Sequence, residues 1–553
     1  MRQLSTGVLI VGAGGAGLYA AIEAARRGAK VLLLDRSLIG RGGATIMAQM
    51  TVAAAVGPEG TDHWQNHLVD TLAAGRGLCD PDLARVLCED GVEVIREMDR
   101  WRVGWARDGA QFAVVQAPGH DRPRCVYVDF LSTGPAVSKT LRAVAQRTPG
   151  ITRLGDALVT DLITTNGAVT GAVALHVESG QALSIAANAT IIATGGLTSL
   201  YRRNSASANM TGDGYALALR AGADLIDMEF VQFFPIGHLS PRLIGMDPIM
   251  WDPFRYKLGG RLLNGLGEEF VERYGSTDSG RYVVTRDLAT YAITKEAAAG
   301  RGSPNGGAWL SFRHIPPAQL RTAFGPVIDR LAANGIDLAR DDVEVSPIAH
   351  YHMGGIRVDK HMATSVAGLY AAGEAVGGAN GANRLSGNAI TEALAFGRAA
   401  GRSAAEQSAG PGLDRDAARA AAQLIVAEGV PCNTAALFVR LQAAMSDHAG
   451  PFRTASGLAA ALNEVHALRA EAGPAPPGKP RPHDLNRTDW FVLRQALLVA
   501  QCVILAAAAR TESRGAHQRE DYPHLDNDWT RNHILRLTDG GLHLSSIPVP
   551  VVP

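Results

Sequence analysis

The sequence predicts an α/β fold: a doubly wound domain of the Rossmann type, which binds dinucleotides, is interrupted by an insertion and followed by a helical region. A short apolar strand, Val8–Val11, runs into a glycine-rich turn and then into an Ala-rich helix that ends before Gly28. Two later apolar strands end at Gly195 and Gly373 with the same glycine-rich exit, although a long stretch of chain separates them. We therefore expect all three strands in one sheet, with the insertion forming a separate domain.

The turn after the first strand has the spacing of a dinucleotide-binding motif. Gly12, Gly14 and Gly17 form a G-x-G-x-x-G pattern between strand and helix. In such a motif the first glycine makes the turn, the second lets the backbone approach a pyrophosphate, and the third lets the helix pack on the strand. Asp35 ends the next strand, Lys30–Leu34, at about the expected distance of twenty residues, where it would accept ribose hydroxyl groups. The pattern therefore predicts a dinucleotide with its phosphates at the helix N-terminus.

Composition and charge exclude several classes of protein. The chain has 553 residues, and 53 Lys+Arg balance 53 Asp+Glu, so it lacks the basic excess typical of nucleic-acid-binding proteins. The 5 cysteines form no C-x-x-C pair and the histidines have no metal-binding spacing, so we expect no metal site. We find no secretory signal and no uncharged apolar run of about 20 residues, so we expect a cytoplasmic protein without a membrane span of its own.

Beyond the third predicted sheet strand, Ala-rich periodic segments predict a run of helices. We expect these helices at Asp414–Ala427, Thr434–Asp447, Ser456–Ala472 and Trp490–Ala509, and an irregular tail after Arg519. A loop rich in proline and glycine separates the last two helices.

Further motifs lie at 228–233 (M-E-F-V-Q-F), 286–302 (R-D-L, K-E and G-R-G), 350–356 (H-Y-H-M-G-G-I), 381–388 (G-A-N-R-L-S-G-N) and 512–523 (E-S-R-G-A-H-Q-R-E-D-Y-P). Together with the dinucleotide signature, they resemble the flavoprotein family of succinate dehydrogenase, fumarate reductase and L-aspartate oxidase. The resemblance extends over nearly the whole chain and implies a Rossmann-type FAD-binding domain with an inserted α+β capping (substrate) domain and a C-terminal helical region. The implied parts are 1–229 and 351–411 for the FAD-binding domain, 230–350 for the capping domain, and 412–553 for the C-terminal helical region and tail.

By this resemblance the chain is an FAD-dependent oxidoreductase. A hydride moves between flavin N5 and one carbon of a C–C or C=C bond, while a proton moves at the adjacent carbon. Arg286 is the implied acid/base, which requires neighbours that hold its side chain close to the reacting carbon. His350 and Arg384 are implied to clamp a substrate carboxylate, for which the guanidinium of Arg384 offers a bidentate hold.

The resemblance also implies which residues contact FAD. They are Gly12, Gly14, Gly15, Ala16 and Gly17; Asp35, Arg36, Gly42, Gly43, Ala44 and Thr45; Ala193, Thr194, Gly195, Gly196 and Asp213; and Gly373, Glu374, Arg384, Gly387, Asn388, Ala389 and Ile390. Family members that attach the flavin covalently use a histidine in the segment that reads Arg41–Ile46 here. That segment contains no histidine, so we expect non-covalent FAD, as in L-aspartate oxidases.

The insertion departs from the family pattern where these enzymes contact a second carboxylate. Phe234-Pro235-Ile236-Gly237 stands where the family has His-Pro-Thr-Gly, and the Thr-Glu pair that follows in the family is missing. Apolar side chains would leave a second carboxylate unpaired, which is costly. We therefore expect a small anionic substrate other than succinate, with one clamped acid group and an apolar or aromatic remainder. The pocket residues are expected to be Phe234, Ile236, Trp251, Asp252 and Arg255, with Phe254 and Tyr256, although the aromatic members are equally compatible with an ordinary core.

The residues leave three roles open. In the first, electrons are exchanged with a separate Fe–S or ferredoxin-like subunit, through which the chain could associate with a membrane. In the second, the chain is a stand-alone oxidase or desaturase that resembles L-aspartate oxidase and is reoxidised by oxygen. In the third, it is a non-catalytic flavin electron-relay subunit, against which the retained Arg286, His350 and Arg384 argue. The absence of a second G-x-G-x-x-G pattern disfavours a nicotinamide dehydrogenase.

Overall fold

The computed structural model describes residues 1–58, 60–129, 131–243, 249–251, 258–274, 286–408 and 410–550, without the side chains of residues 286 and 287. The chain forms two compact units. The first unit comprises residues 1–202, 206–231 and 351–553, and the second comprises residues 203–205 and 232–350. The predicted α/β class, with an inserted part and C-terminal helices, is confirmed.

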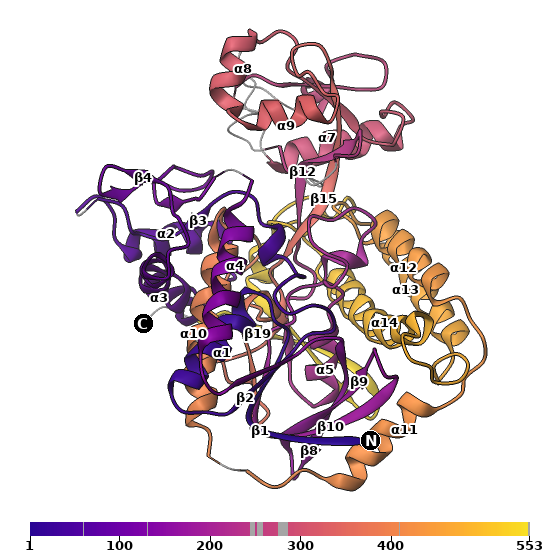
Figure 1. The fold of residues 1–553 in the computed structure, drawn as a ribbon. Coiled ribbons are helices and arrows are strands. Elements are labelled where there is room, and N and C mark those ends of the chain that lie inside the picture. Colours follow the sequence, from indigo (N-terminus) through magenta and orange to yellow (C-terminus); the bar gives the residue numbers. More distant parts are fainter. Residues whose placement is uncertain are drawn as a thin grey trace. The chain divides into compact units, whose positions relative to one another are not determined.

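The core of the first unit is a 7-stranded sheet in the order β7-β2-β1-β10-β9-β8, in which β17 also pairs with β10 (Figure 1). Its strands are β1 (Arg2–Val11), β2 (Val31–Leu34), β7 (Ile151–Leu154), β8 (Ala157–Thr165), β9 (Ala168–His176), β10 (Gln181–Ile192) and β17 (Leu369–Ala371). β10 pairs in parallel with β1 and, near its end, with β17, while its first half pairs antiparallel with β9. The three glycine-terminated strands that were predicted to share a sheet are therefore neighbours.

Helices from distant parts of the chain pack together beside this sheet. α1 (Gly15–Arg26) lies against α10 (Asn388–Glu406), where added Cβ atoms at Gly397 and Gly401 would lie 2.5 Å from carbonyl oxygens of α1. Glycine at these two positions therefore permits the close approach of the helices. The first unit also contains the helices α2 (Trp64–Ala74), α3 (Pro81–Arg100), α4 (Thr133–Arg147) and α5 (Asp213–Arg220), and the 3-10 turns η1 (Thr45–Met47), η2 (Thr198–Leu200) and η4 (Gly373–Ala375). Two short strand pairs complete this part: β3 (Val52–Ala53) with β6 (Cys125–Val126), and β4 (Arg107–Asp108) with β5 (Gln111–Phe112).

The C-terminal helices begin close to the predicted positions because polar residues cap them. They are α11 (Arg415–Val426), α12 (Thr434–His448), α13 (Ala455–Ala472) and α14 (Leu485–Ala509), and α12, α13 and α14 pack on one another (Figure 1). Asp484 accepts the Arg487 backbone N–H, so α14 begins earlier than the predicted Trp490. By length and composition α14 could cross a membrane, yet 67% of its most apolar window is buried within the structure. A core helix of a folded protein has the same composition.

The tail after Arg519 is more regular than predicted, and that prediction was wrong. β18 (Arg531–Thr538) and β19 (Gly541–Pro548) form a hairpin after the turn η5 (Asn527–Trp529). The hairpin joins β11 (Leu225–Ile226) and β16 (Gly355–Ile356) in a sheet with the order β16-β11-β18-β19. Asp539-Gly540, between the two strands, is a hairpin signal in the sequence that the prediction did not use.

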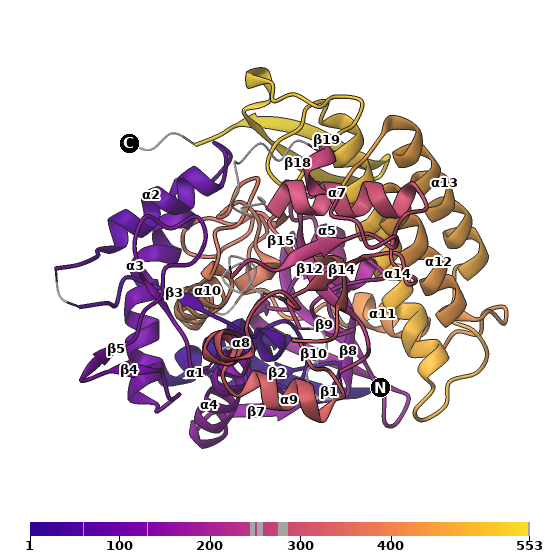
Figure 2. The same ribbon diagram turned by 90° about the horizontal axis from the view of Figure 1, so that it is seen from above.

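The second unit is built on the sheet β12-β15-β14-β13 (Figure 2). Its elements are β12 (Val231–Ser240), β13 (Arg261–Leu263), β14 (Ala308–Ser311) and β15 (Val343–His352), with α7 (Arg286–Ala298), α8 (Pro317–Phe324), α9 (Val327–Ala333) and the turn η3 (Val271–Tyr274). β14 pairs antiparallel with both β13 and β15. β12 and β15 are also the strands through which the chain enters and leaves this unit.

Candidate active site

The glycine-rich turn after β1 is shaped by close contacts that exclude larger side chains. An added Cβ at Gly12 would lie 2.4 Å from the Ala193 carbonyl oxygen, and one at Gly17 would lie 1.8 Å from the Gly12 carbonyl oxygen. At Gly14, by contrast, no heavy atom lies within 4 Å of an added Cβ. Gly14 is the N-cap of α1, so open space adjoins the backbone N–H groups that attract phosphate. The turn therefore fits the pyrophosphate of a dinucleotide.

Asp35 lies at the end of β2 and contacts this turn directly. Its Oδ2 accepts the Ala13 backbone N–H at 2.9 Å, and its Oδ1 accepts the Ser37 backbone N–H at 2.8 Å. The next residue, Arg36, donates to Asp213 Oδ2 at 2.9 Å, so two predicted cofactor residues form an ion pair with each other. Asp35 thus lies beside the predicted phosphate position, as a ribose-binding carboxylate requires.

Some of the other predicted cofactor residues of the first unit lie near the N-terminus of α1, and others lie at the start of α10. Thr45 Oγ1 accepts the Gly15 backbone N–H at 3.1 Å, and η1 begins at this threonine after Gly42, Gly43 and Ala44. A Cβ atom added at Gly373 would lie 2.7 Å from Ala16 Cβ, and one added at Gly196 would lie 2.5 Å from Glu374 Oε1. Gly387, with φ of +85°, precedes α10, which begins with Asn388, Ala389 and Ile390. Ala193, Thr194 and Gly195 follow β10 directly.

A buried cation with two buried carboxyl groups lies at the start of α10. The Arg384 guanidinium carbon lies 4.4 Å from the centre of the Tyr351 ring, and the Tyr351 hydroxyl donates to Glu392 Oε2 at 2.6 Å. Burial raises the pKa of Glu374 to about 8 and that of Glu392 to about 7. Both carboxyl groups are therefore largely or half protonated near neutral pH, which leaves the positive charge of Arg384 only partly compensated by them. A buried guanidinium in this state is suited to binding an anion.

In the second unit, Ser205 and Phe234 contact His350. The Ser205 Oγ lies 2.7 Å from His350 Nδ1, which fixes the orientation of the imidazole ring. The Phe234 ring centre lies 5.8 Å from that of His350. Phe234 and Ile236, both on β12, are buried. His350 therefore has a polar partner at one ring nitrogen and an apolar neighbour beside the ring.

Trp251 belongs to the core of the second unit. It is fully buried, and its ring centre lies 6.0 Å from those of Phe312 and Phe324. Its indole N–H donates to His238 Nδ1 at 3.3 Å, while His238 Nε2 contacts the Pro241 carbonyl oxygen. The ring nitrogens of His238 are thus hydrogen-bonded within the protein, as expected of a histidine that serves the fold.

Arg286 is the first residue of α7, but its side chain lies outside the described part of the structure, as do Asp252, Phe254, Arg255 and Tyr256 entirely. The far end of α7 is firmly held. The buried Glu296 carboxylate accepts from Arg301 Nη2 at 2.8 Å and from Tyr274 at 2.8 Å, and these hydrogen bonds lower its pKa to about 2. The K-E and G-R-G motifs after Arg286 therefore contribute an ion pair that anchors this helix.

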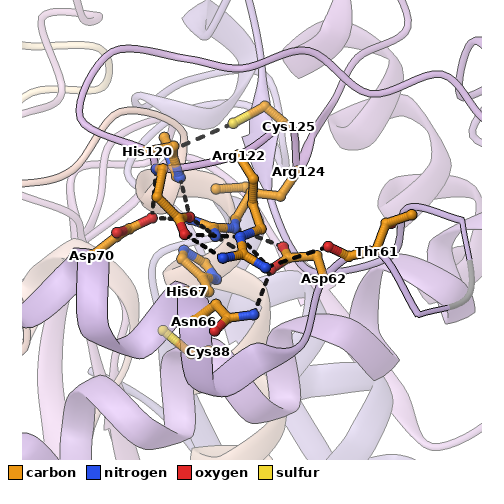
Figure 3. A network of polar contacts seen from close by, with 12 residues as sticks. Thr61, Asp62, Asn66, His67, Asp70, Cys88, His120, Arg122, Arg124 and Cys125 are labelled. Carbon is orange, nitrogen blue, oxygen red and sulfur yellow. Dashed lines mark hydrogen bonds and ion pairs between the residues drawn. The ribbon is translucent and has the colours of Figure 1, made fainter.

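The structure also brings together a buried polar cluster that no sequence motif predicted (Figure 3). Arg124 lies at its centre and donates to Asp62, Asp70 and Asp121. These residues come from separate segments before β6 and around α2 and belong to no motif with a recognisable spacing. The only sequence signal was the density of charged residues and histidines at 62–70 and 120–124, two segments for which no element was predicted.

Comparison with known proteins identifies a family to which this chain is similar. The FAD binding domain model matches residues 7–390, and the fumarate reductase flavoprotein C-term model matches residues 439–552. The chain is 32% identical to one subunit of the fumarate reductase (CoM/CoB) of Methanothermobacter marburgensis, over 96% of each protein. It is 33% identical to L-aspartate oxidase of Streptomyces coelicolor, over 100% of this chain and 95% of that one.

A solved structure shows the same similarity in three dimensions. FrdA of E. coli quinol fumarate reductase matches with a TM-score of 0.90 and 29% sequence identity. The match covers 100% of this chain and 98% of that chain. Sequence and structure thus agree over nearly the full length of the protein.

Proposed function

We propose a substrate class for this chain, which belongs to the flavoprotein family of fumarate reductase, succinate dehydrogenase and L-aspartate oxidase and is an FAD-dependent oxidoreductase. The substrate is an anion other than succinate, with one clamped acid group, an apolar or aromatic remainder, and a reacting C–C or C=C bond. The carrying observation is the buried apolar pair Phe234 and Ile236 on β12, with Phe234 against His350. A second carboxylate placed against these side chains would lose its hydration and gain no hydrogen bond.

In this proposal three residues of the chain act on the substrate. Arg384 holds the acid group, because its guanidinium is buried and the raised pKa values of Glu374 and Glu392 reduce the negative charge of these two carboxyl groups. His350, whose imidazole ring is oriented by Ser205, is the second residue to which the family motif assigns a role in binding the acid group. Arg286 delivers or removes the proton at the carbon next to the one that exchanges hydride, a role that stands on the family motif.

FAD would be held by the turn at Gly12–Gly17, by Asp35, and by the segments at Thr45, Gly196 and Glu374. When bound, FAD supplies the hydride donor or acceptor of the reaction. We propose that the attachment is non-covalent, because the segment 41–46 contains no histidine. Thr45 in this segment instead binds the Gly15 backbone through its hydroxyl group.

Acid precipitation is expected to release all of the flavin. Without a covalent bond, denaturation removes every contact that holds FAD, so the yellow colour passes into the supernatant. The measurement is the absorbance of supernatant and pellet after treatment with trichloroacetic acid. Flavin fluorescence that stays with the precipitated chain would contradict non-covalent binding.

The substrate class is tested with photoreduced protein under anaerobic conditions. We expect cinnamate, which has one carboxylate and an aromatic remainder, to restore the oxidised flavin band faster than fumarate does. The C=C bond then takes up two electrons and two protons, and 3-phenylpropionate is the product to be measured. Rapid reoxidation by fumarate with none by cinnamate would show that a dicarboxylate site survives, and would overturn the argument from Phe234 and Ile236.

For the electron partner, we propose a separate Fe–S or ferredoxin-like subunit in the cytoplasm, with membrane association only through that partner. One relative is itself named as a subunit of a fumarate reductase, which supports an assembly. Another relative is L-aspartate oxidase, which supports the alternative of a stand-alone oxidase or desaturase that uses oxygen. A non-catalytic electron relay is the third possibility, and binding of a small acid that perturbs the flavin spectrum would argue against it.

Hydrogen peroxide formation separates the first two possibilities. If a partner subunit takes the electrons, the purified single chain is expected to react slowly with oxygen and rapidly with a ferredoxin. The measurement is peroxide released per flavin reoxidised in air. Stoichiometric and rapid peroxide formation by the chain alone would favour the oxidase.

A further inference from the structure

Arg124 is a fully buried cation held by three carboxylates from different segments of the first unit. Its Nε donates to Asp62 Oδ2 at 2.8 Å, its Nη2 donates to Asp121 Oδ1 at 2.6 Å, and its Nη1 donates to Asp70 on α2 (Figure 3). The Arg124 side chain has 0% exposure and that of Asp62 has 1%, so this ion pair is shielded from water. A guanidinium fixed on three sides can orient whatever group it contacts next.

That next group is His120, which links the cluster to the turn before α10. Arg124 Nη1 lies 2.8 Å from His120 Nδ1, and His120 Nε2 lies 2.7 Å from the Ser386 carbonyl oxygen. A guanidinium can only donate, so Nδ1 accepts and Nε2 carries the proton that it donates to Ser386. Burial and the charge of Arg124 lower the pKa of His120, which keeps the ring neutral. A single tautomer therefore connects Arg124 to the turn.

A second contact from α2 holds the same turn two residues later. His67 Nε2 lies 2.8 Å from Asn388 Oδ1, and Asn388 Nδ2 donates to Thr71 Oγ1 at 3.1 Å. Between these contacts, the Gly387 carbonyl oxygen accepts the backbone N–H of Ala53 at 3.0 Å. Residues 386, 387 and 388 are thus each held by a separate hydrogen bond from another segment. This is the turn that follows Arg384, whose Nη1 donates to the Leu385 carbonyl oxygen at 3.2 Å.

We propose that Arg124 and His120, supported by Asp62 and Asp70, are positioning residues that fix the turn 385–388 and thereby aim Arg384 at the substrate anion. This inference rests on the proposed function of Arg384. The cluster itself does not touch the substrate. The cluster restricts the conformations of Arg384 in the free protein, so less conformational entropy is lost when an anion binds. Binding is therefore tighter.

The test compares two substitutions of His120, one that can keep the hydrogen bond to the Ser386 carbonyl oxygen and one that cannot. Gln reaches as far as Nε2 and can still donate to the Ser386 carbonyl oxygen, whereas Asn reaches only as far as Nδ1 and loses that bond. Hydrogen–deuterium exchange of the peptide that contains residues 385–388 reports the turn directly. A benzoate titration, followed by the flavin difference spectrum, reports the anion affinity of Arg384.

We expect His120→Asn to speed exchange in this peptide and to weaken benzoate binding on the order of tenfold, while His120→Gln stays close to the wild type. Arg124→Gln should weaken benzoate binding at least as much, and Arg107→Gln is its matched control. Arg107 is exposed and pairs with Asp99, outside this cluster. Should Arg124→Gln fail to fold, because it leaves buried carboxylates without a cation, the two His120 variants still decide.

Wild-type exchange and benzoate affinity in His120→Asn would overturn the proposal. Equal losses in His120→Asn and His120→Gln, with matching falls in melting temperature and FAD content, would also overturn it, because the residue would then only support the fold. A wild-type protein that shows no benzoate response, while His120→Asn still exchanges faster at the turn, would contradict the proposed role of Arg384 and leave the positioning of the turn supported.

Discussion

Replacing Arg286 by alanine is expected to reduce turnover by about 10²–10⁴-fold while FAD stays bound, because positioned proton transfer contributes an acceleration of that size. The expectation for FAD follows from the division of the chain. Arg286 belongs to the second unit, whereas the predicted FAD residues belong to the first. The helix that Arg286 begins should also survive, since the Glu296–Arg301 ion pair anchors its other end.

Single-turnover reoxidation of the photoreduced flavin by substrate measures this effect without interference from product release. Arg286→Lys keeps a cation and is expected to retain a small part of the rate. Arg261→Ala is the matched control, because Arg261 lies on β13 of the same unit in an exposed pair with Glu269. Activity that survives in Arg286→Ala would show that another group handles the proton.

Replacing Arg510 by alanine is expected to destabilise the protein by about 3–5 kcal/mol, the usual cost of breaking a buried ion pair from one side. Arg510 and its partners Glu229 and Glu512 are fully buried, with Arg510 Nε 2.6 Å from Glu229 Oε1 and Nη1 3.0 Å from Glu512 Oε1. Burial alone would raise the pKa of Glu229, but electrostatic interaction and hydrogen bonding with its neighbours, Arg510 among them, outweigh burial and hold this pKa well below its usual value. Without Arg510, the buried negative charge of Glu229 loses the guanidinium that neutralises it, which destabilises the folded state.

The substitution should also destabilise the C-terminal hairpin, because Arg510 donates to the carbonyl oxygens of Trp529, just before β18, and of Arg531, at its start. Thermal unfolding followed by tryptophan fluorescence measures the effect. Glu229→Gln combined with Arg510→Met removes both charges and is expected to be less harmful than Arg510→Ala. Arg321→Ala breaks an exposed pair with Asp329 and should leave the melting temperature unchanged. A melting temperature equally unaffected in Arg510→Ala would mean that the buried network does not support the fold.

The elements that sequence reasoning predicted well are those in which local pattern and tertiary structure agree. The apolar run at 8–11 and the glycines after it permit a buried parallel strand followed by a tight turn, and Asp414, Asn433 and Asp484 cap helices by local hydrogen bonds. The C-terminal hairpin was missed because β18 owes its place to long-range pairing with β11. Its alternation was too weak to stand out from a polar tail.

The candidate site divides in the same way. Asp35 was predicted from the spacing of the dinucleotide motif, and Arg384 and Glu374 were predicted from the resemblance to the flavoprotein family. Ser205 was not predicted as a partner of His350, because a single serine has no pattern and the contact spans 145 positions of the chain. Arg124 was missed for the same reason, since its carboxylates come from helix α2 and two other segments that only folding brings together.

The sequence by itself determined the dinucleotide turn, the run of C-terminal helices and the family motifs, because each depends on residues that are close along the chain. Only the tertiary structure decided that Trp251 packs in the core of the second unit, that the Arg36 and Asp213 side chains pair, and that a buried cation supports the turn after Arg384. These features depend on which distant side chains share a low-dielectric interior. Burial and partner choice there set the charge of each group.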